Sequence, residues 1–203
     1  MSVSRTSNRK RKRAKRVLGI DMSLNGTAIC FPNGTTDVCT LNGPKSTTPQ
    51  IKGHDRLVHI IKWLDEFNYA GITHVCWEQY AFSRSGQVFN IGELGGILKL
   101  YFLSRGIPII AVTPSTLKLF TTGKGNAKKE EMQEAILERW GYWYEDDNEA
   151  DAYALMQYGR YWLKEVNAEN SVETDALLDK VEYYGVTALL QTFAISLTRG
   201  LND

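Results

Sequence analysis

The sequence predicts an α/β fold in which helices flank a mixed five-stranded sheet. Short apolar runs of strand length occur early in the chain, and later runs alternate with helical patterns. Asn33-Gly34 separates two of the early runs, and this pair suits a tight hairpin because both residues tolerate positive φ values. We therefore expect three antiparallel strands, followed by two parallel strands that are connected through helical crossovers.

The early elements follow from apolar patterning. The run at 17–21 is apolar and ends on Asp21, which is typical of a buried strand. Apolar residues at three- and four-residue spacing predict an amphipathic helix over 51–69. The other two early strands are expected at 26–31 and 35–41, on either side of the hairpin.

The later elements are bounded by glycine, proline and acidic residues. Gly71 ends the preceding helix, and Pro114 is favoured at a first helical position. Asp146 and Asp147 are suited to capping the helix that follows them. The predicted elements are strands at 74–79 and 107–112 and helices at 86–104, 113–120, 127–139, 148–164, 172–184 and 186–199.

Charge is distributed unevenly along the chain, which suggests three regions. Residues 1–16 contain eight of the 24 Lys and Arg residues and none of the 23 acids, so the rest carries 16 cations and 23 anions. We expect a basic disordered tail at 1–16, an α/β domain at 17–165 and a helical extension at 166–203. Arg11 and Arg13 of the tail are candidates for DNA phosphate contacts, although a solvated arm or a nuclear-import signal also fits.

Composition excludes several classes of protein. With 43% apolar and 11% aromatic residues, the chain can form a real core. The three cysteines have no C-x-x-C spacing, so no disulfide framework or zinc knuckle is expected. No secretory signal or membrane-spanning run is evident, so we expect a soluble intracellular protein. A bacterial cytoplasm, the host cytoplasm of a phage, a nucleus or a virus factory would each suit it.

Three acids occupy positions that the predicted sheet would bring together. Asp21 and Glu78 end two strands that should be neighbours, and Asp151 lies near the start of a later helix. Adjacent strands are about 5 Å apart, so two carboxylates there repel each other unless a divalent cation separates them. Oxygen ligands of this kind suit Mg²⁺ or Mn²⁺.

Helical spacing offers a fourth oxygen ligand. Asp147 and Asn148 precede Asp151 by four and three residues, so either can share a face with it. Two metal ions about 3.5–4 Å apart would polarise a phosphodiester, one by generating a hydroxide nucleophile and the other by stabilising the leaving oxygen. The expected chemistry is metal-assisted phosphodiester hydrolysis.

Four segments, in order and spacing, resemble the RuvC family of Holliday junction resolvases. They are Val-Leu-Gly-Ile-Asp-Met-Ser-Leu-Asn-Gly-Thr-Ala (17–28), Trp-Glu-Gln (77–79), Lys-Leu-Phe-Thr-Thr-Gly-Lys-Gly-Asn-Ala-Lys-Lys (118–129) and Asn-Glu-Ala-Asp-Ala-Tyr-Ala-Leu (148–155), and the resemblance spans about 17–163. It implies an RNase H-like nuclease domain, a homodimer, and symmetric incisions across four-way DNA junctions in recombination and repair.

The resemblance also assigns site residues. Asp21, Glu78 and Asp151 match three of the family's four metal ligands. The fourth, an Asp or His in the family, falls on Asn148, which is a departure. Either Asp147 assists, which we favour, or Asn148 binds weakly, or the native residue was changed to stop cleavage.

Basic and aromatic residues near these acids are candidates for the active-site surroundings and for DNA binding. Lys118 and Lys129 match basic positions of the family, and a fixed ammonium near the scissile phosphate would offset developing charge. Tyr80 and Phe82 follow Glu78 where the family places an aromatic residue that stacks on an unpaired base. The expected DNA-binding set is completed by Lys124, Lys128, Arg11 and Arg13.

The sequence also fits three other interpretations. Actin-like kinases share the opening strand-Asp motif, but the chain contains no second Asp-Gly-rich turn. A junction-binding protein with a decayed metal site would explain Asn148. A nuclease of the same superfamily acting on other branched DNA or on RNA would use the same hydrolytic residues, because these residues do not define the substrate's shape.

Overall fold

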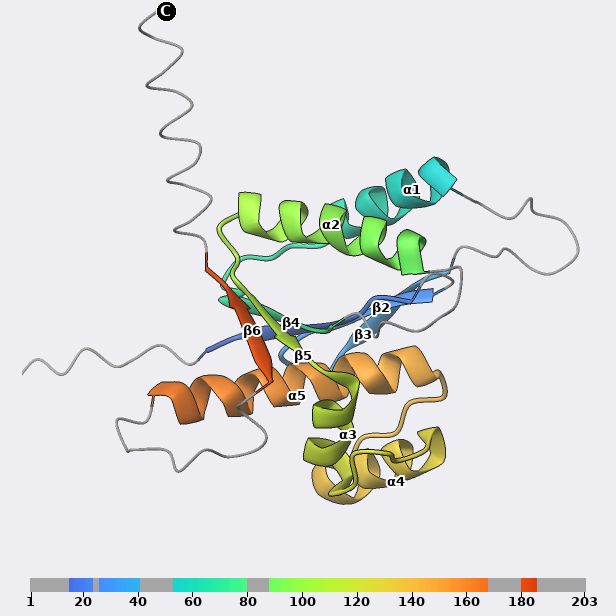
Figure 1. Ribbon diagram of the computed structural model, residues 1–203, viewed down its shortest axis with the longest axis vertical. Helices are drawn as coiled ribbons and strands as arrows, with labels where there is room; N and C mark the ends of the chain where they lie inside the picture. Colours follow the sequence, from blue (N-terminus) through green and yellow to red (C-terminus); the bar gives the residue numbers. More distant parts are fainter. Residues whose placement is uncertain (1–14, 24–25, 41–52, 80–87, 168–179, 186–203) are drawn as a thin grey trace, which may run out of the picture.

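The computed structural model describes residues 15–23, 26–40, 53–79, 88–167 and 180–185. A six-stranded mixed sheet lies at its centre, in the order β3-β2-β1-β4-β5-β6 (Figure 1). The strands are β1 (Val17–Asp21), β2 (Gly26–Cys30), β3 (Thr36–Thr40), β4 (His74–Glu78), β5 (Ile109–Val112) and β6 (Val181–Tyr184). The predicted α/β fold class is confirmed, with one strand more than expected.

Strand directions follow the prediction for the first five strands. The first three form an antiparallel meander, and β4 and β5 continue the sheet parallel to β1. Two of these strands, β1 and β4, are neighbours in register, with Ile20 opposite Trp77. The ends of β1 and β4 therefore meet at one edge of the sheet.

Helices cover both faces of the sheet. In Figure 1, α1 (Gly53–Asp65) and α2 (Val88–Ser104) lie on one face, and α5 (Asp147–Asn167) crosses the other. On the side of α5, the chain adds α3 (Pro114–Thr122) and α4 (Lys129–Trp140). The two resulting apolar cores are separated by the sheet: Leu18 and Ile20 belong to the α1–α2 core, and Val17 belongs to the α5 core.

Helix α5 packs very closely against the central strands. Gly159 makes part of this approach possible, because a Cβ placed on it would be 2.8 Å from Cys76 Cβ and from Val17 Cγ1. Tyr153, Tyr158 and Leu155 of the same helix are completely or almost completely buried. The helix that carries Asp151 is thus held firmly against β1 and β4.

The helix predicted over 172–184 is wrong at its carboxyl end, where β6 occupies Val181–Tyr184. This strand pairs antiparallel with β5, with Ile109 opposite Tyr184. Val181 packs on the α5 core and Tyr184 on the α1–α2 core, so a single short strand contributes to both layers. Residues 172–179 and the helix predicted over 186–199 lie outside the described residues.

Helix α3 is longer than predicted and is capped at both ends. The Thr113 side chain accepts a hydrogen bond from the N–H of Thr116, and Gly123 ends the helix in the left-handed region at φ 80°.

Within the described ranges, no helix has both the length and the apolar character needed to cross a membrane.

Candidate active site

The two strand-end acids lie next to each other at the carboxyl edge of the sheet. Asp21 ends β1 and Glu78 ends β4, one residue after the paired positions Ile20 and Trp77. Both residues are half-buried. Asp151 approaches them from α5, one residue before the fully buried Ala152.

Burial raises the pKa values of all three acids, and the charge of a neighbouring carboxylate, which is Asp147 in the case of Asp151, adds to the effect. The pKa of Asp21 is raised well above its ordinary value, first by burial and then by the charges of Asp151 and Glu78. Burial, followed by the charge of Asp151, raises the pKa of Glu78 from 4.5 to about 7. Burial raises the pKa of Asp151 from 3.8 to about 6, against the opposing effect of Lys129. The structure therefore brings these three carboxylates into one electrostatic cluster.

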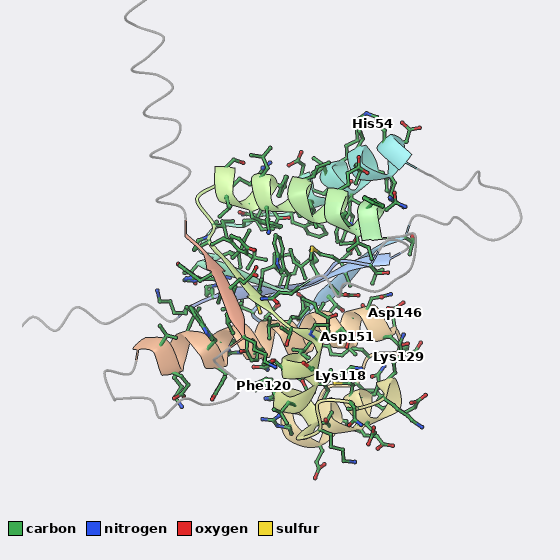
Figure 2. The ribbon with its side chains drawn as sticks, in the orientation of Figure 1. His54, Lys118, Phe120, Lys129, Asp146 and Asp151 are labelled. Atoms are coloured by element: carbon green, nitrogen blue, oxygen red, sulfur yellow. The ribbon has the colours of Figure 1, made fainter. Side chains whose placement is uncertain are left out.

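Two lysines from separate helices reach the same cluster. Lys129 of α4 donates through Nζ to Asp147 Oδ2 at 2.7 Å, and its charge also lowers the pKa values of Asp21 and Asp151. Lys118 of α3 acts in the same direction on Glu78 and Asp151. Figure 2 shows Lys118, Lys129, Asp146 and Asp151 on the α5 side of the sheet, where the three helices meet.

The relative position of α3 and α4, and hence of the two lysines, is fixed at the far end by Arg139. Its Nη1 donates to the carbonyl oxygens of Phe120 and Thr121, at 3.0 Å for Thr121. The guanidinium also lies 4.5 Å from the centre of the Trp140 ring. Arg139 therefore ties α4 to α3, so the two helices that carry Lys118 and Lys129 are held in a fixed relative position.

Asp146 is a residue of the site that sequence reasoning missed. The sequence predicts only a helix cap at this position, and Asp146 Oδ1 does accept the N–H of Asn148 at 2.7 Å. Its charge also raises the pKa of Asp21, so it belongs to the electrostatic surroundings of the cluster. The available signal was its place in an acidic run directly before Asn148, the position at which the family pattern loses its carboxylate.

Asp147 and Asn148 occupy different surroundings. Asp147 is paired with Lys129 and acts on Asp151, one turn further along α5. The Asn148 side chain lies against β2, where a Cβ placed on Gly26 would be 3.2 Å from Asn148 Nδ2.

The predicted DNA-binding residues fall into two groups. Lys124 and Lys128 are exposed, and Lys124 Nζ pairs with Glu131 Oε1 at 2.8 Å. Glu131 also accepts the backbone N–H of Lys128, which ties the turn before α4 to its first helical turn. The remaining candidates, Tyr80, Phe82, Arg11 and Arg13, lie outside the described residues.

The donor chemistry of the cluster fits a hard divalent cation. Asp21, Glu78 and Asp151 offer only carboxylate oxygens, which suit Mg²⁺ or Mn²⁺ better than a metal that prefers nitrogen or sulfur. A divalent cation would also offset the repulsion among three partly buried carboxylates. No group of three or more His, Cys, Asp or Glu side chains in the described part of the chain is already arranged at metal-ligand geometry.

Comparisons with known proteins agree with this arrangement, although no family model matches the chain. The chain is 31% identical over 163 residues to crossover junction endodeoxyribonuclease RuvC of Thermomicrobium roseum, covering 71% of this chain and 94% of the relative. It is 30% identical over 151 residues to the protein of the same name from Gloeobacter violaceus, covering 71% of this chain and 87% of that relative.

Solved structures show the same fold. The Thermus thermophilus RuvC structure matches with a TM-score of 0.55 at 22% identity, covering 74% of this chain and 96% of its own. T. thermophilus RuvC in complex with Holliday junction substrate matches with a TM-score of 0.56 at 20% identity, covering 72% of this chain and 94% of its own. The class that this architecture defines is the RNase H-like α/β fold. The chain belongs to the RuvC family of crossover junction endodeoxyribonucleases.

Proposed function

We propose that this protein is a Holliday junction resolvase, a structure-specific endonuclease that nicks four-way DNA junctions symmetrically. The observation that carries the proposal is the cluster of Asp21, Glu78 and Asp151 at one sheet edge, with Lys118 and Lys129 beside it. The names of the relatives, and the Holliday junction bound to T. thermophilus RuvC, support the same substrate for this chain.

The acidic cluster is proposed to hold two Mg²⁺ or Mn²⁺ ions. Asp21, Glu78 and Asp151 would supply the main ligands, and Asp147 or Asn148 would supply the fourth, with Asp146 adding negative charge nearby. The bound cations would offset the charge that builds on the phosphodiester oxygens during hydrolysis. The chain itself positions the ligands, because β1, β4 and the tightly packed α5 are rigid supports for them.

The two lysines would act on the substrate from the α5 side of the sheet, where Figure 2 shows them. A fixed ammonium stabilises charge on a phosphoryl group at little reorganisation cost, because the protein has already oriented it. Lys129 is held by Asp147 without substrate and would exchange part of this pairing for a phosphate oxygen. Tyr80 or Phe82 would stack on an unpaired junction base, and Lys124, Lys128, Arg11 and Arg13 would contact phosphates.

Symmetric nicking requires two active sites, and α2 has a face suited to a homodimer. Phe89 and Leu100 are 86% and 56% exposed on this face, and Gly92 and Gly96 lie between them. A Cβ on either glycine would meet nothing within 4 Å, so a second helix can approach the backbone closely. Leu100→Glu should shift the protein to monomers in sedimentation, while Leu137→Glu, at a leucine 48% exposed on α4, should not.

A catalytically weakened junction-binding protein is the second candidate, and Asn148 is the observation that favours it. The deciding experiment compares cleavage of a synthetic four-way junction, a flap, a duplex and an RNA–DNA hybrid, with and without Mg²⁺. A resolvase should nick the junction at paired positions and should lose this activity in Asp21→Asn. Junction binding without any nicking would favour the second candidate, and preferential cleavage of another substrate would identify a different nuclease of this fold.

A further inference from the structure

The first turn of α5 carries candidate metal ligands and is also the end of a helix. Asp147 and Asn148 are its first two residues, and Asp151 follows one turn later. The first backbone N–H groups of a helix have no partner within it, so a helix end opens locally more easily than its interior. Metal ligands, however, have to be held within about 0.5 Å of their working geometry. Contacts between this turn and the sheet therefore bear directly on metal binding.

Glu149 makes such a contact with the edge strand β3. The Thr36 hydroxyl donates to Glu149 Oε1 at 2.6 Å, and this hydrogen bond joins residues 113 positions apart in the chain. Thr36 pairs with Cys30 in β2, and Cys30 pairs with Gly19 in β1. The hydrogen bond therefore attaches the first turn of α5 to the sheet at the level of Gly19, two residues before Asp21.

The Glu149 side chain is directed away from the acidic cluster. Successive residues of an α-helix are about 100° apart around its axis, so Glu149 and Asp151 project from nearly opposite sides of α5. Burial raises the pKa of the Cys30 thiol to about 12, and the charge of Glu149 adds to this effect, so the carboxylate lies near β2 as well as β3. Glu149 is thus placed to hold the turn rather than to supply a further ligand.

The segment before α5 is attached to the same part of the sheet. Tyr144 OH donates to the carbonyl oxygen of Gly34 at 2.8 Å, and this hydrogen bond is buried. Gly34 lies between β2 and β3, two residues before Thr36. Tyr144 and Glu149 therefore fix the start of α5 from both sides, one just before the helix and the other within its first turn.

We propose that Glu149 is a positioning residue of the metal site, because its hydrogen bond with Thr36 sets where the first turn of α5 lies relative to the ends of β1 and β4. Loss of this bond would let the turn shift, and Asp151 with it, although every ligand would still be present. The inference rests on the proposed function, since it requires the acidic cluster to hold divalent cations.

Calorimetric titration with Mn²⁺ tests the inference without relying on cleavage. Thr36→Val removes the donor with little change of shape, and Glu149→Ala removes the acceptor. Each should weaken Mn²⁺ binding about tenfold, the lower end of the loss found when groups that orient metal ligands are removed. The double variant should bind Mn²⁺ no more weakly than either single variant, because both residues act through one hydrogen bond.

Glu149→Gln separates positioning from an effect of charge. Its amide oxygen can still accept from the Thr36 hydroxyl, so this variant should recover most of the Mn²⁺ affinity that Glu149→Ala loses. If charge alone mattered, Glu149→Gln would bind Mn²⁺ as weakly as Glu149→Ala, and Thr36→Val would bind it like the wild type. That result would overturn the inference.

The matched control is Asp37→Ala, at the residue after Thr36. Asp37 Oδ1 accepts a hydrogen bond from Trp63 Nε1 at 2.8 Å, which attaches β3 to α1 on the other face of the sheet. The control therefore also removes a carboxylate and a contact of β3, but its Mn²⁺ affinity should be unchanged whatever its melting temperature. An equal loss of Mn²⁺ affinity in Asp37→Ala, or no loss in Thr36→Val and Glu149→Ala, would show a purely structural role and overturn the inference.

Junction cleavage by the same proteins distinguishes this failure from failure of the proposed function. If the variants change Mn²⁺ binding as expected but the wild type nicks no four-way junction, the resolvase proposal falls and the positioning role stands. If the wild type nicks the junction and the variants bind Mn²⁺ like the control, only the positioning role falls. A wild type that binds no Mn²⁺ would overturn the metal site and, with it, this inference.

Discussion

Gly19 of β1 lies directly against the backbone of Ala152 in α5. A Cβ placed on Gly19 would be only 1.9 Å from the carbonyl oxygen of Ala152 and 2.6 Å from the backbone nitrogen of Met156. Ala152 follows Asp151, and Gly19 precedes Asp21 by two residues. The absence of a side chain at Gly19 therefore sets how closely two acids of the cluster can approach.

Gly19→Ala should destabilise the protein by about 3 kcal/mol or more, because backbone atoms of α5 would have to move. Any folded fraction should cleave poorly, since the shift carries Asp151 away from Asp21. Gly159→Ala should cost less, about 1–2 kcal/mol, because its Cβ would meet side-chain carbons of Cys76 and Val17 at 2.8 Å, whereas that of Gly19→Ala would meet a backbone oxygen at 1.9 Å. Urea denaturation of both variants checks the order, and equal stabilities would contradict it.

The metal-free protein should lose stability through Glu78 as the pH rises from about 4.5 to about 7. Its pKa is raised from 4.5 to about 7 on folding, so the folded state binds more protons than the unfolded state in this window. Glu78→Gln removes this titration, and its stability advantage over the wild type should grow across the window and level off above it.

The comparison of Glu78→Gln with the wild type is needed because His74 contributes to the pH dependence of stability with the opposite sign. Burial and Lys15 lower the pKa of His74 to about 4, so its contribution to stability increases between about pH 4 and 6.5. This contribution is common to both proteins and cancels in the difference. Urea denaturation in EDTA at several pH values measures that difference, and a difference that shrinks with pH would contradict the assignment.

Asn148→Asp should lower the Mg²⁺ concentration needed for half-maximal junction cleavage by about tenfold, because it adds a charged ligand where the family carries one. The same variant should be less stable than the wild type in EDTA, since it adds a fourth carboxylate to a repelling cluster. Asp146→Asn and Asp147→Asn, assayed in parallel, distinguish the two neighbouring acids. An unchanged Mg²⁺ requirement in Asn148→Asp would exclude this position from the metal site.

Lys118→Met and Lys129→Met should each reduce the cleavage rate about 100-fold, because each removes a fixed charge beside the reacting phosphate. The free energy of unfolding should change by less than about 1 kcal/mol in Lys129→Met, since the ion pair of Lys129 with Asp147 is largely exposed. Lys164→Met is the matched control, because Lys164 forms an exposed pair with Glu165 at the other end of α5. Rates for the two site variants close to that of the control would show that these lysines do not act on the substrate.

The sequence predicts the five strands and the three acids because both depend on local patterns and on simple rules of topology. Strand β6 could not be predicted, because Val181–Tyr184 becomes a strand through pairing with β5, some seventy residues away in the sequence. The place of Asp146 in the site could not be predicted for a similar reason. Its effect on Asp21 arises from the path of the chain before α5, which no spacing rule contains.

The central claim is that Asp21, Glu78 and Asp151 jointly hold divalent cations, and calorimetric titration with Mn²⁺ tests it most directly. The wild type should bind Mn²⁺ with release of protons from the raised-pKa acids, whereas Asp21→Asn and Glu78→Gln should each lose most of this binding. Mn²⁺ binding of equal affinity and stoichiometry in the wild type and both variants would contradict the account.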